Sequence, residues 1–161
     1  GLTSLQIIFN LFRQDAITRL FPTAQKNDVG IIVRLPLASG ILAGKMNRDT
    51  TFAESDHRNY NRDGKFFSVG ETFSGVPYEQ GLDLVEYLRT LLPEGMSMAQ
   101  MAMRWLLDQP AVSTVITGAS RPDQVVENAS TSDIPPLNSE LHARLTYFYW
   151  AEIAPHIQVP V

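Results

Sequence analysis

The chain has 161 residues, 44% hydrophobic and 19% charged, with a formal net charge of -4 and no cysteine. This composition is typical of one globular domain with its own core, and it excludes disulfides and thiolate chemistry. The sequence has no basic stripe, no apolar run long enough for a membrane span and no visible signal peptide, so we expect a cytoplasmic protein without a nucleic-acid or membrane partner.

The first half of the chain predicts a β-α-β unit. The apolar stretch that starts at Leu5 follows Gly1–Ser4 without a polar tail, so we expect the chain to begin inside a larger fold. The expected elements are a strand at Gln6–Asn10, a helix at Ala16–Asn27 that Pro22 weakens or starts, and a strand at Ile31–Leu35. Because both strands are almost continuously hydrophobic, we expect them to be buried on both faces, as in parallel sheets.

Helices dominate the second half. A small-residue loop, Pro36–Lys45, precedes the long polar segment 46–77, which has no periodicity and is expected to be a loop. Helices are then predicted at Tyr78–Leu92, at Met98–Asp108 with a capping box at Ser97 and Gln100, and at Asn138–Ile153. A third strand, Thr114–Thr117, stands between the last two of these helices and is likewise expected to be buried on both faces.

The order of the elements favours parallel βαβ units. Three strands are few for such a sheet. They form either a small open sheet or part of a barrel that needs about eight strands to close.

The segment Ser113–Ala129 contains the first candidate site. Its strand ends in Gly118, and Ser120 is expected to cap the helix that follows, with Asp123 three residues later. Free backbone N–H groups and the positive end of the helix dipole meet at a helix N-terminus, and Arg121 adds a full positive charge there. These features suit a phosphate, although they also describe a well-capped helix.

The loop Pro36–Lys45 is the second candidate site. Gly40 and Gly44 allow close approach of the backbone, Ser39 offers a hydroxyl and Lys45 a charge. In βα barrels a recurring phosphate site is built from the loops after the last two strands. Two successive strand-end loops that suit anions match this arrangement.

Three blocks of sequence resemble the aldo-keto reductases. They are LQIIFNLF, VRLPLASGILAGK and ITGASRPDQVVENA, which are similar to that family's blocks at strands 6, 7 and 8. The resemblance covers nearly the whole chain, and we assign residues 1–161 to one domain. It implies an α/β fold that is the C-terminal half of a (β/α)8 TIM barrel, hence an incomplete barrel, and an NADPH-dependent oxidoreductase that reduces aldehydes or ketones without a metal.

The resemblance also implies a set of cofactor-binding residues. Gln6 would bind the nicotinamide carboxamide, and the strand-7 loop would line the pyrophosphate. The loop and helix after strand 8 would hold the adenosine ribose, its 2′-phosphate and the adenine. The i, i+3, i+4 spacing of the three helical residues in this set by itself favours a solvated helix face, and only the resemblance favours a binding role. Besides Gln6, the implied contacts are Pro36, Leu37, Ser39, Gly40, Lys45, Gly118, Ala119, Ser120, Arg121, Gln124, Glu127 and Asn128.

Arg34 departs from the family pattern, which usually has an aromatic ring stacked on the nicotinamide at this place. At the end of its strand, Arg34 shares a face with Ile32 and can look into a barrel mouth. The alternative is a strand-end charge that reaches water. We include Arg34 among the expected cofactor contacts.

No catalytic residue can be assigned in this chain. By resemblance, the family's Asp, Tyr, Lys and His come from the first half of the barrel, so we expect this chain alone to be inactive. His57, His142 and His156 have no metal spacing and are interpreted as surface residues. The segment 46–77 is either a solvated loop or a lid that clamps the cofactor.

Three hypotheses follow. The first is the cofactor-binding half of an NADPH-dependent aldo-keto reductase that acts on a small carbonyl substrate. The second is a non-enzymatic nucleotide-binding module resembling the channel-associated β subunits of the same fold. The third is an independent α/β domain for another phosphate ligand. In each case open strand edges would allow self-association.

Overall fold

Three parallel strands form one sheet in the order β1-β2-β3, so each strand lies beside its predecessor in the chain. The computed structural model describes residues 1–157 and places β1 at Ser4–Ile8, β2 at Gly30–Arg34 and β3 at Val112–Val115. Helical segments separate the strands, which makes the chain a series of βα units. This confirms the parallel α/β architecture that the sequence predicts.

Helical segments of very different length connect the strands. α1 (Ala16–Arg19) and α2 (Phe21–Lys26) join β1 to β2. Between β2 and β3 lie η1 (Ala38–Ala43), α3 (His57–Tyr60), η2 (Val69–Glu71), η3 (Phe73–Gly75), α4 (Tyr78–Arg89) and α5 (Met98–Leu107). After β3 come α6 (Pro122–Ser130), η4 (Thr131–Asp133), α7 (Ser139–Phe148), a π-helical segment η5 (Tyr149–Ile153) and η6 (Ala154–His156).

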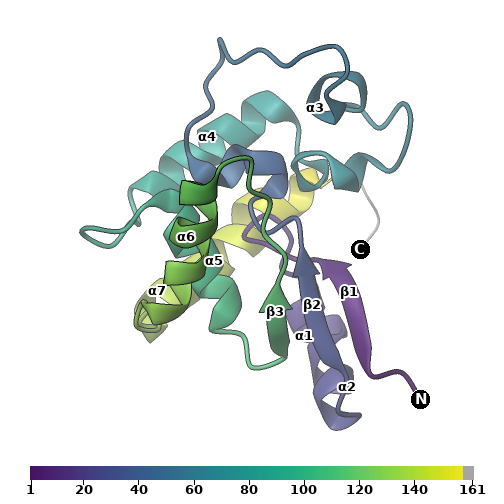
Figure 1. Cartoon of the computed structure of the whole chain (residues 1–161), viewed down its shortest axis with the longest axis vertical. Helices are drawn as coiled ribbons and strands as arrows, with labels where there is room; N and C mark the ends of the chain where they lie inside the picture. Colours follow the sequence, from purple (N-terminus) through teal and green to yellow (C-terminus); the bar gives the residue numbers. More distant parts are fainter. Residues whose placement is uncertain (158–161) are drawn as a thin grey trace.

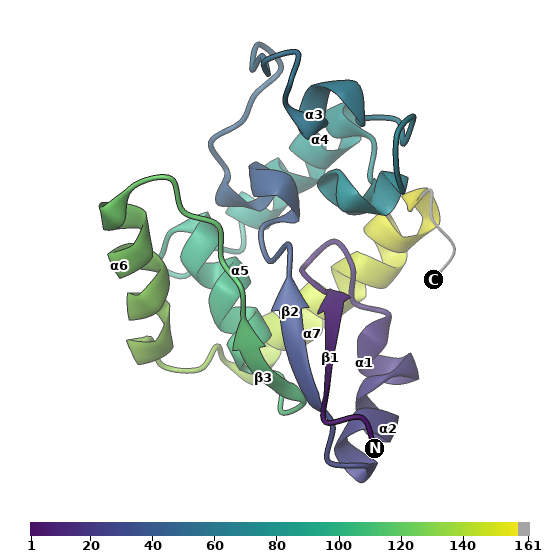
Figure 2. The same cartoon turned by 45° about the vertical axis from the view of Figure 1, so that its right-hand side comes forward.

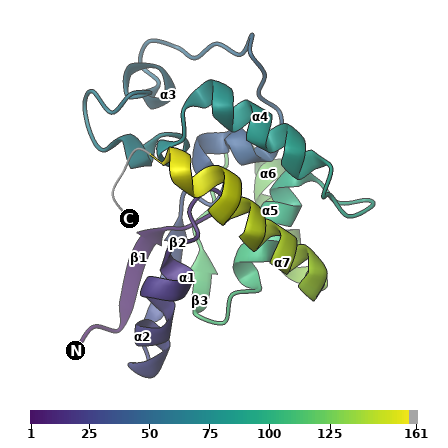
Figure 3. The ribbon, with the colours of Figure 1, turned by 180° about the vertical axis from the view of Figure 1, so that it is seen from behind.

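The core lies between one face of the sheet and the helices. Ile31 and Val33 of β2 are fully buried on this face. Figures 1 and 3 show α1, α2, α5 and α7 behind the strands in one view and in front of them in the opposite view. Trp105 of α5 is also fully buried, and its ring lies 5.1 Å from that of Phe9, just beyond β1.

The other face of the sheet has no covering layer among the described residues. Gln6 and Thr114 are exposed there, while Ile32 and Arg34 are half-buried. The expectation that all three strands are buried on both faces is therefore wrong for the described chain. The physical reason is that β1 and β3 are edge strands of an open sheet, whereas a closed barrel would enclose this face.

The observed strands begin earlier than the predicted ones. The first two are displaced by one or two residues and end before Asn10 and Leu35, and β3 ends two residues before Thr117. Leu35 has a φ of 54°, which takes it out of the β region, and Asn10 pairs with Arg13 in a tight turn. Hydrophobic patterns do not reveal such strand-terminating turns.

Some predicted helices have different bounds. The predicted helix Ala16–Asn27 is two short helices divided at Leu20, with Pro22 in the first turn of the second. The capping box is confirmed, since Ser97 and Gln100 exchange their side-chain hydrogen bonds at 3.2 and 2.9 Å. α4 ends at Arg89 instead of Leu92, and α5 at Leu107 instead of Asp108. The last predicted helix, Asn138–Ile153, is α7 continued by η5.

The segment 46–77 is folded and covers the C-terminal ends of the strands. In Figure 2 the strand arrows point toward the side where this segment and α3 lie. Asn61 is fully buried and its Oδ1 accepts hydrogen bonds from Phe66 N and Phe67 N at 3.0 and 2.9 Å, while its Nδ2 donates to Thr72 Oγ1 at 3.1 Å. The interpretation as a solvated loop is therefore wrong at this point of the segment. The backbone N–H groups of Phe66 and Phe67 have no helix or strand partner and donate instead to the buried side chain of Asn61.

Candidate functional site

A cleft of about 440 Å³ opens where β2 and β3 end, and we call it the strand-end cleft. Its volume is within the range of small-molecule sites. Open α/β sheets bind ligands outside the carboxyl ends of their strands, which is where this cleft lies. It is lined by Arg34, Leu35, Pro36, Leu37, Ser39, Gly40, His57, Arg58, Ile116, Thr117 and Gly118.

Left-handed backbone shapes the β2 side of the cleft. Leu35, Ala38, Ser39 and Gly40 have φ values of 54°, 47°, 59° and 93°. Only glycine adopts this region without cost, so the three side-chain-bearing neighbours need support from their surroundings. Ser39 receives it: its Oγ donates to the Glu71 carbonyl and accepts from Phe73 N, each at 3.2 Å.

The side chain of Asn10 also supports the turn that begins at Leu35. It is fully buried, and its Nδ2 donates to the Leu35 carbonyl at 2.9 Å and to Ser74 Oγ at 2.8 Å. Its Oδ1 accepts from Phe12 N at 2.9 Å. One side chain thus links the ends of β1 and β2 to the segment 46–77.

Arg34 and Arg58 are the two arginines that line the cleft. Arg34 donates through two nitrogens to both carboxylate oxygens of Glu71. Arg58 pairs with Asp56, with Nη2 2.6 Å from Oδ2, and its guanidinium stacks 4.6 Å above the Phe52 ring. A Cβ built on Gly40 would lie 3.8 Å from Arg58 Nη1, so this guanidinium stands beside the glycine turn.

His57 adds a third basic side chain to the lining. Its Nε2 lies 3.4 Å from Ser39 Oγ and its Nδ1 3.6 Å from Asp56 Oδ1, and the side chain is 38% exposed. His57 is therefore at the surface, as interpreted from the sequence, but it is the first residue of α3 and not part of a loop, and its side chain lines the cleft. The lining itself contains no carboxylate, but its two arginines are paired with the carboxylates of Glu71 and Asp56, which balance their charge.

The carboxylates behind the arginines are held ionised. Hydrogen bonds from Arg58 lower the pKa of Asp56 from 3.8 to about 2, and the hydrogen bonds from Arg34 lower the pKa of Glu71. The pKa values of Arg34 and Arg58 are raised by the same contacts. Both pairs therefore remain charged over the whole neutral range.

Acid is expected to weaken the segment 46–77 through Asp56. Because its folded pKa lies below its unfolded value, its contribution is present above about pH 4 and is lost as the pH falls toward 2, at most about 2 kcal/mol. Urea unfolding of Asp56→Asn should give a lower free energy than wild type at pH 6 and a smaller drop between pH 4 and pH 2. Asp63→Asn removes a carboxylate that forms no ion pair with a described residue, and is the control. Equal pH profiles for Asp56→Asn and wild type would contradict this role.

Helix α6 begins later than predicted. Arg121 is its N-cap, in an extended conformation, and Pro122 is its first residue, so the expectation that Ser120 caps the helix is wrong. Gln124 Oε1 takes the place of the cap: it accepts from Ser120 N at 2.7 Å and from Arg121 N at 3.2 Å. The reason is that a glutamine at the third helical position can reach back to the preceding backbone N–H groups.

Arg121 is already paired. Its Nη2 lies 3.1 Å from Asp123 Oδ2, and the two side chains are 60% and 68% exposed. This contact raises the pKa of Arg121 and lowers that of Asp123. An exposed pair of this kind is weak and exchanges readily, so Arg121 remains available to a phosphate.

The strand-end cleft brings together six of the fourteen expected cofactor contacts: Arg34, Pro36, Leu37, Ser39, Gly40 and Gly118. The other eight lie outside the lining. Gln6 is exposed on β1, and Lys45 is exposed after the left-handed Gly44 that ends η1. The rest belong to the loop and helix beyond Gly118: Ala119, Ser120, Arg121, Gln124, Glu127 and Asn128.

The α6 residues nevertheless continue from the edge of the cleft. Gln124 contacts Ser120, and Asn128 Nδ2 lies 3.4 Å from the Gly118 carbonyl, so two members of the polar trio face the loop. Glu127 is exposed. An extended ligand could therefore contact both the cleft and α6, whereas a single phosphate is too small to contact both.

Sequence reasoning missed His57, Arg58 and Glu71 as site residues. His57 lies 18 residues from its partner Ser39 and Glu71 lies 37 residues from Arg34, while Arg58 pairs with Asp56 in the same segment, which has no periodicity. Isolated charges in a polar segment carry no local pattern. The only sequence signal was the segment's length, which favours a functional loop.

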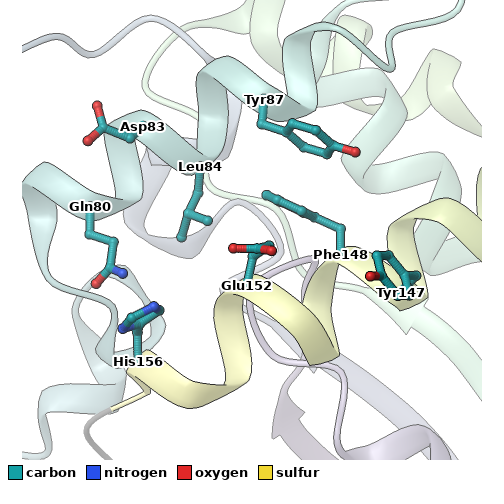
Figure 4. Close-up of a pocket in the computed structure, with 8 residues that line it drawn as sticks. All are labelled: Gln80, Asp83, Leu84, Tyr87, Tyr147, Phe148, Glu152 and His156. Carbon is teal, nitrogen blue, oxygen red and sulfur yellow. The ribbon is translucent and has the colours of Figure 1, made fainter.

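A second groove, of about 470 Å³, lies between α4 and the C-terminal helical segments. Figure 4 shows Glu152 rising between the two helices and Tyr87 above Phe148. Asp83 also lines this groove and accepts from Arg48 Nη2 at 2.6 Å. Two carboxylates make it unsuitable for an anionic ligand, whereas the lining of the strand-end cleft contains none.

Two further features limit the alternatives. Within residues 1–157, no three His, Cys, Asp or Glu side chains are grouped so that they could hold a metal ion. In the same range, no helix is both long and apolar enough to cross a bilayer.

The comparisons with known proteins agree with this architecture. The sequence profile of the aldo/keto reductase family matches residues 1–149. The chain belongs to the aldo/keto reductase family. The resemblance of the three sequence blocks is thereby confirmed, and the three parallel strands are consistent with part of the (β/α)8 barrel of this family.

Individual relatives include enzymes and channel subunits. The chain is 32% identical over 136 residues to a probable voltage-gated potassium channel subunit beta of Arabidopsis thaliana, covering 80% of this chain and 38% of that protein. It is 36% identical over 110 residues to the L-glyceraldehyde 3-phosphate reductase of Escherichia coli K12, covering 68% and 30%. The chain thus spans between 30% and 38% of the length of these relatives.

A solved aldo/keto reductase structure has the same fold. The glycerol dehydrogenase of Gluconobacter oxydans superposes with a TM-score of 0.73 at 29% identity, covering 98% of this chain and 44% of that one. An aldo-keto reductase of Bacillus halodurans superposes with a TM-score of 0.65 at 22% identity, which supports the fold alone. Nearly all of the chain therefore corresponds to less than half of a family structure.

Proposed function

We propose that this chain forms the part of an NADPH site that holds the pyrophosphate and adenosine of the cofactor, in an aldo/keto reductase that reduces a small aldehyde or ketone. The observation that carries the proposal is the strand-end cleft, which gathers six of the expected cofactor contacts at the ends of β2 and β3 and opens toward the exposed Arg121 beyond Gly118. A dinucleotide has the length and charge to extend from this cleft to Arg121. The cofactor would supply the hydride, and the chain would bind and orient it.

The catalytic groups of this reductase are proposed to come from other parts of the complete protein. The described chain has no assigned proton donor, and its relatives are more than twice as long. We therefore expect the isolated chain to bind cofactor without turnover. A carbonyl reductase assay on it should give no activity above background, while the same assay on a chain that includes the family's remaining strands should give NADPH oxidation.

Titration of the isolated chain with NADPH and with NADH tests the binding role. NADPH is expected to bind more tightly, with energy transfer from tryptophan to the reduced nicotinamide as the readout. Saturable binding of NADPH would support the proposal. No binding of either dinucleotide at millimolar concentration would refute a preformed cofactor site in this chain.

Arg121→Ala is expected to weaken NADPH about 5–10-fold and NADH less than 2-fold, because the lost partner is the 2′-phosphate that only NADPH carries. Dissociation constants from the same titration measure the effect. Arg144→Ala, which removes an exposed arginine from α7, should change neither. Equal losses for the two dinucleotides with Arg121→Ala would remove the 2′-phosphate assignment.

A second function has some support. Three channel-subunit relatives, from Arabidopsis, rice and fission yeast, are 32–34% identical to this chain. A regulatory module of this fold would bind the nucleotide and use it as a signal. The complete coding sequence distinguishes the two: the family's Asp, Tyr, Lys and His in the preceding barrel strands favour the reductase, and their absence favours the module.

A further inference from the structure

The ion pair between Arg34 and Glu71 joins the sheet to the segment 46–77. Arg34 is the last residue of β2, and Glu71 is the last residue of η2. Nη1 donates to Oε2 and Nη2 to Oε1, so both carboxylate oxygens are used. The side chains are 34% and 29% exposed, which makes this pair better shielded from water than Arg121–Asp123.

The backbone of Glu71 is held in place independently of its carboxylate. Its carbonyl accepts a hydrogen bond from Ser39 Oγ, which also accepts from Phe73 N. Two residues after Glu71, the chain turns through the left-handed Phe73 and Ser74 into the bond with Asn10. The backbone of Glu71 therefore stays beside Arg34, so the carboxylate remains within reach of the guanidinium and only rotation of the Glu71 side chain breaks the pair.

An incoming phosphate meets different obstacles at the two arginines. At Arg121 it replaces an exposed carboxylate two residues away on the same turn. At Arg34 it would have to displace a bidentate carboxylate whose backbone is held beside the arginine, and it would be repelled by that carboxylate as well. The lowered pKa of Glu71 keeps this negative charge present at neutral pH.

We propose that Glu71 is a specificity-determining residue of the strand-end cleft: it prevents Arg34 from binding anions and makes the β2 end of the cleft accept a planar ring without negative charge. The inference rests on the proposed dinucleotide function for the identity of that ring. Its electrostatic part, that Glu71 neutralises Arg34, follows from the contacts of these two residues alone.

The test compares wild type with Glu71→Gln, using inorganic pyrophosphate as the probe. Glutamine keeps the shape and one acceptor oxygen but removes the charge, so Arg34 becomes an uncompensated cation at the cleft. We expect pyrophosphate to bind about 5–10-fold more tightly, and the gain to shrink as salt rises from 50 to 300 mM. Isothermal titration calorimetry on the whole chain measures both.

Two matched variants make the result specific. Glu79→Gln removes the same charge from an exposed ion pair with Arg48 on α4 and should leave pyrophosphate binding as in wild type. In the double variant Arg34→Gln/Glu71→Gln, the gain should disappear, because its source is Arg34. A gain that persists in the double variant, or no gain in a folded Glu71→Gln protein, would overturn the inference.

The double variant also decides the matter if Glu71→Gln fails to fold. A pyrophosphate affinity within about 2-fold of wild type is expected when Arg34 is already neutralised, whereas a loss of 10-fold or more would make Arg34 a direct phosphate ligand. NADPH titration separates this inference from the proposed function. An Arg34-dependent gain for pyrophosphate without NADPH binding would refute the dinucleotide site and keep the role of Glu71.

Discussion

Replacing Asn10 by alanine is expected to lower the free energy of unfolding by about 3–5 kcal/mol, because the change leaves buried polar groups without partners. The Phe12 N–H and the Ser74 hydroxyl each lose a buried hydrogen bond, and the Leu35 carbonyl loses a part-buried one. The loss also removes the support of Leu35, whose left-handed backbone starts the cleft loop. Urea unfolding followed by circular dichroism measures the effect.

Asn27→Ala is the matched control for Asn10. It removes the same side chain from an exposed helix end, where Nδ2 donates to the Thr23 carbonyl at 2.8 Å, and is expected to cost about 0.5 kcal/mol. Asn10→Asp provides a second comparison, since it keeps the acceptor for Phe12 N but cannot donate to Leu35. A cost below about 1 kcal/mol for both Asn10 variants would mean that the three elements are not joined at this residue.

Trp105→Ala is expected to lower the free energy of unfolding by about 3–5 kcal/mol through the cavity it leaves. Trp105 is fully buried, stands on α5 and packs on Phe9 at the end of β1, with ring centroids 5.1 Å apart. Its removal takes away the contact between α5 and Phe9, the residue that precedes Asn10. Thermal and urea unfolding both report this change.

The indole nitrogen of Trp105 sharpens the prediction. Nε1 is buried and has no hydrogen-bond partner among the described residues. Trp105→Phe keeps most of the ring and removes this unpaired donor, so its cost should stay below about 1.5 kcal/mol. Trp150→Ala, at a ring that is 48% exposed, should cost about 1 kcal/mol or less. Similar losses at Trp105 and Trp150 would contradict the assigned core.

Local sequence patterns predicted much of the fold. The parallel strands, the capping box at Ser97 and the stripe of α4 follow from periodicity and propensity, which act over a few residues. The errors lie where a long-range contact overrides them. Leu35 leaves the β region at the turn that Asn10 supports from 25 residues away. The start of α6 is an exception with a local cause, because Gln124 accepts from Ser120 N and Arg121 N and the helix begins after Arg121.

The residues of the candidate site also fall into those that local sequence patterns predict and those that depend on long-range contacts. The loop Pro36–Gly40 and the segment around Gly118 could be expected at the site from sequence, because each comes shortly after a strand. His57, Arg58 and Glu71 could not, because they reach the cleft from a segment whose fold depends on buried side-chain hydrogen bonds, such as those of Asn61. No local pattern encodes contacts of that kind.

The sequence by itself determined the family, the order of the βα units and the two strand-end loops that suit an anion, since all of these are written in short contiguous blocks. Only the tertiary structure decided which charges remain free. It paired Arg34 with Glu71 in a sheltered contact and left Arg121 in an exposed one. The physical reason is that the availability of a charge depends on its partner and its burial, and both are set by residues distant in the chain.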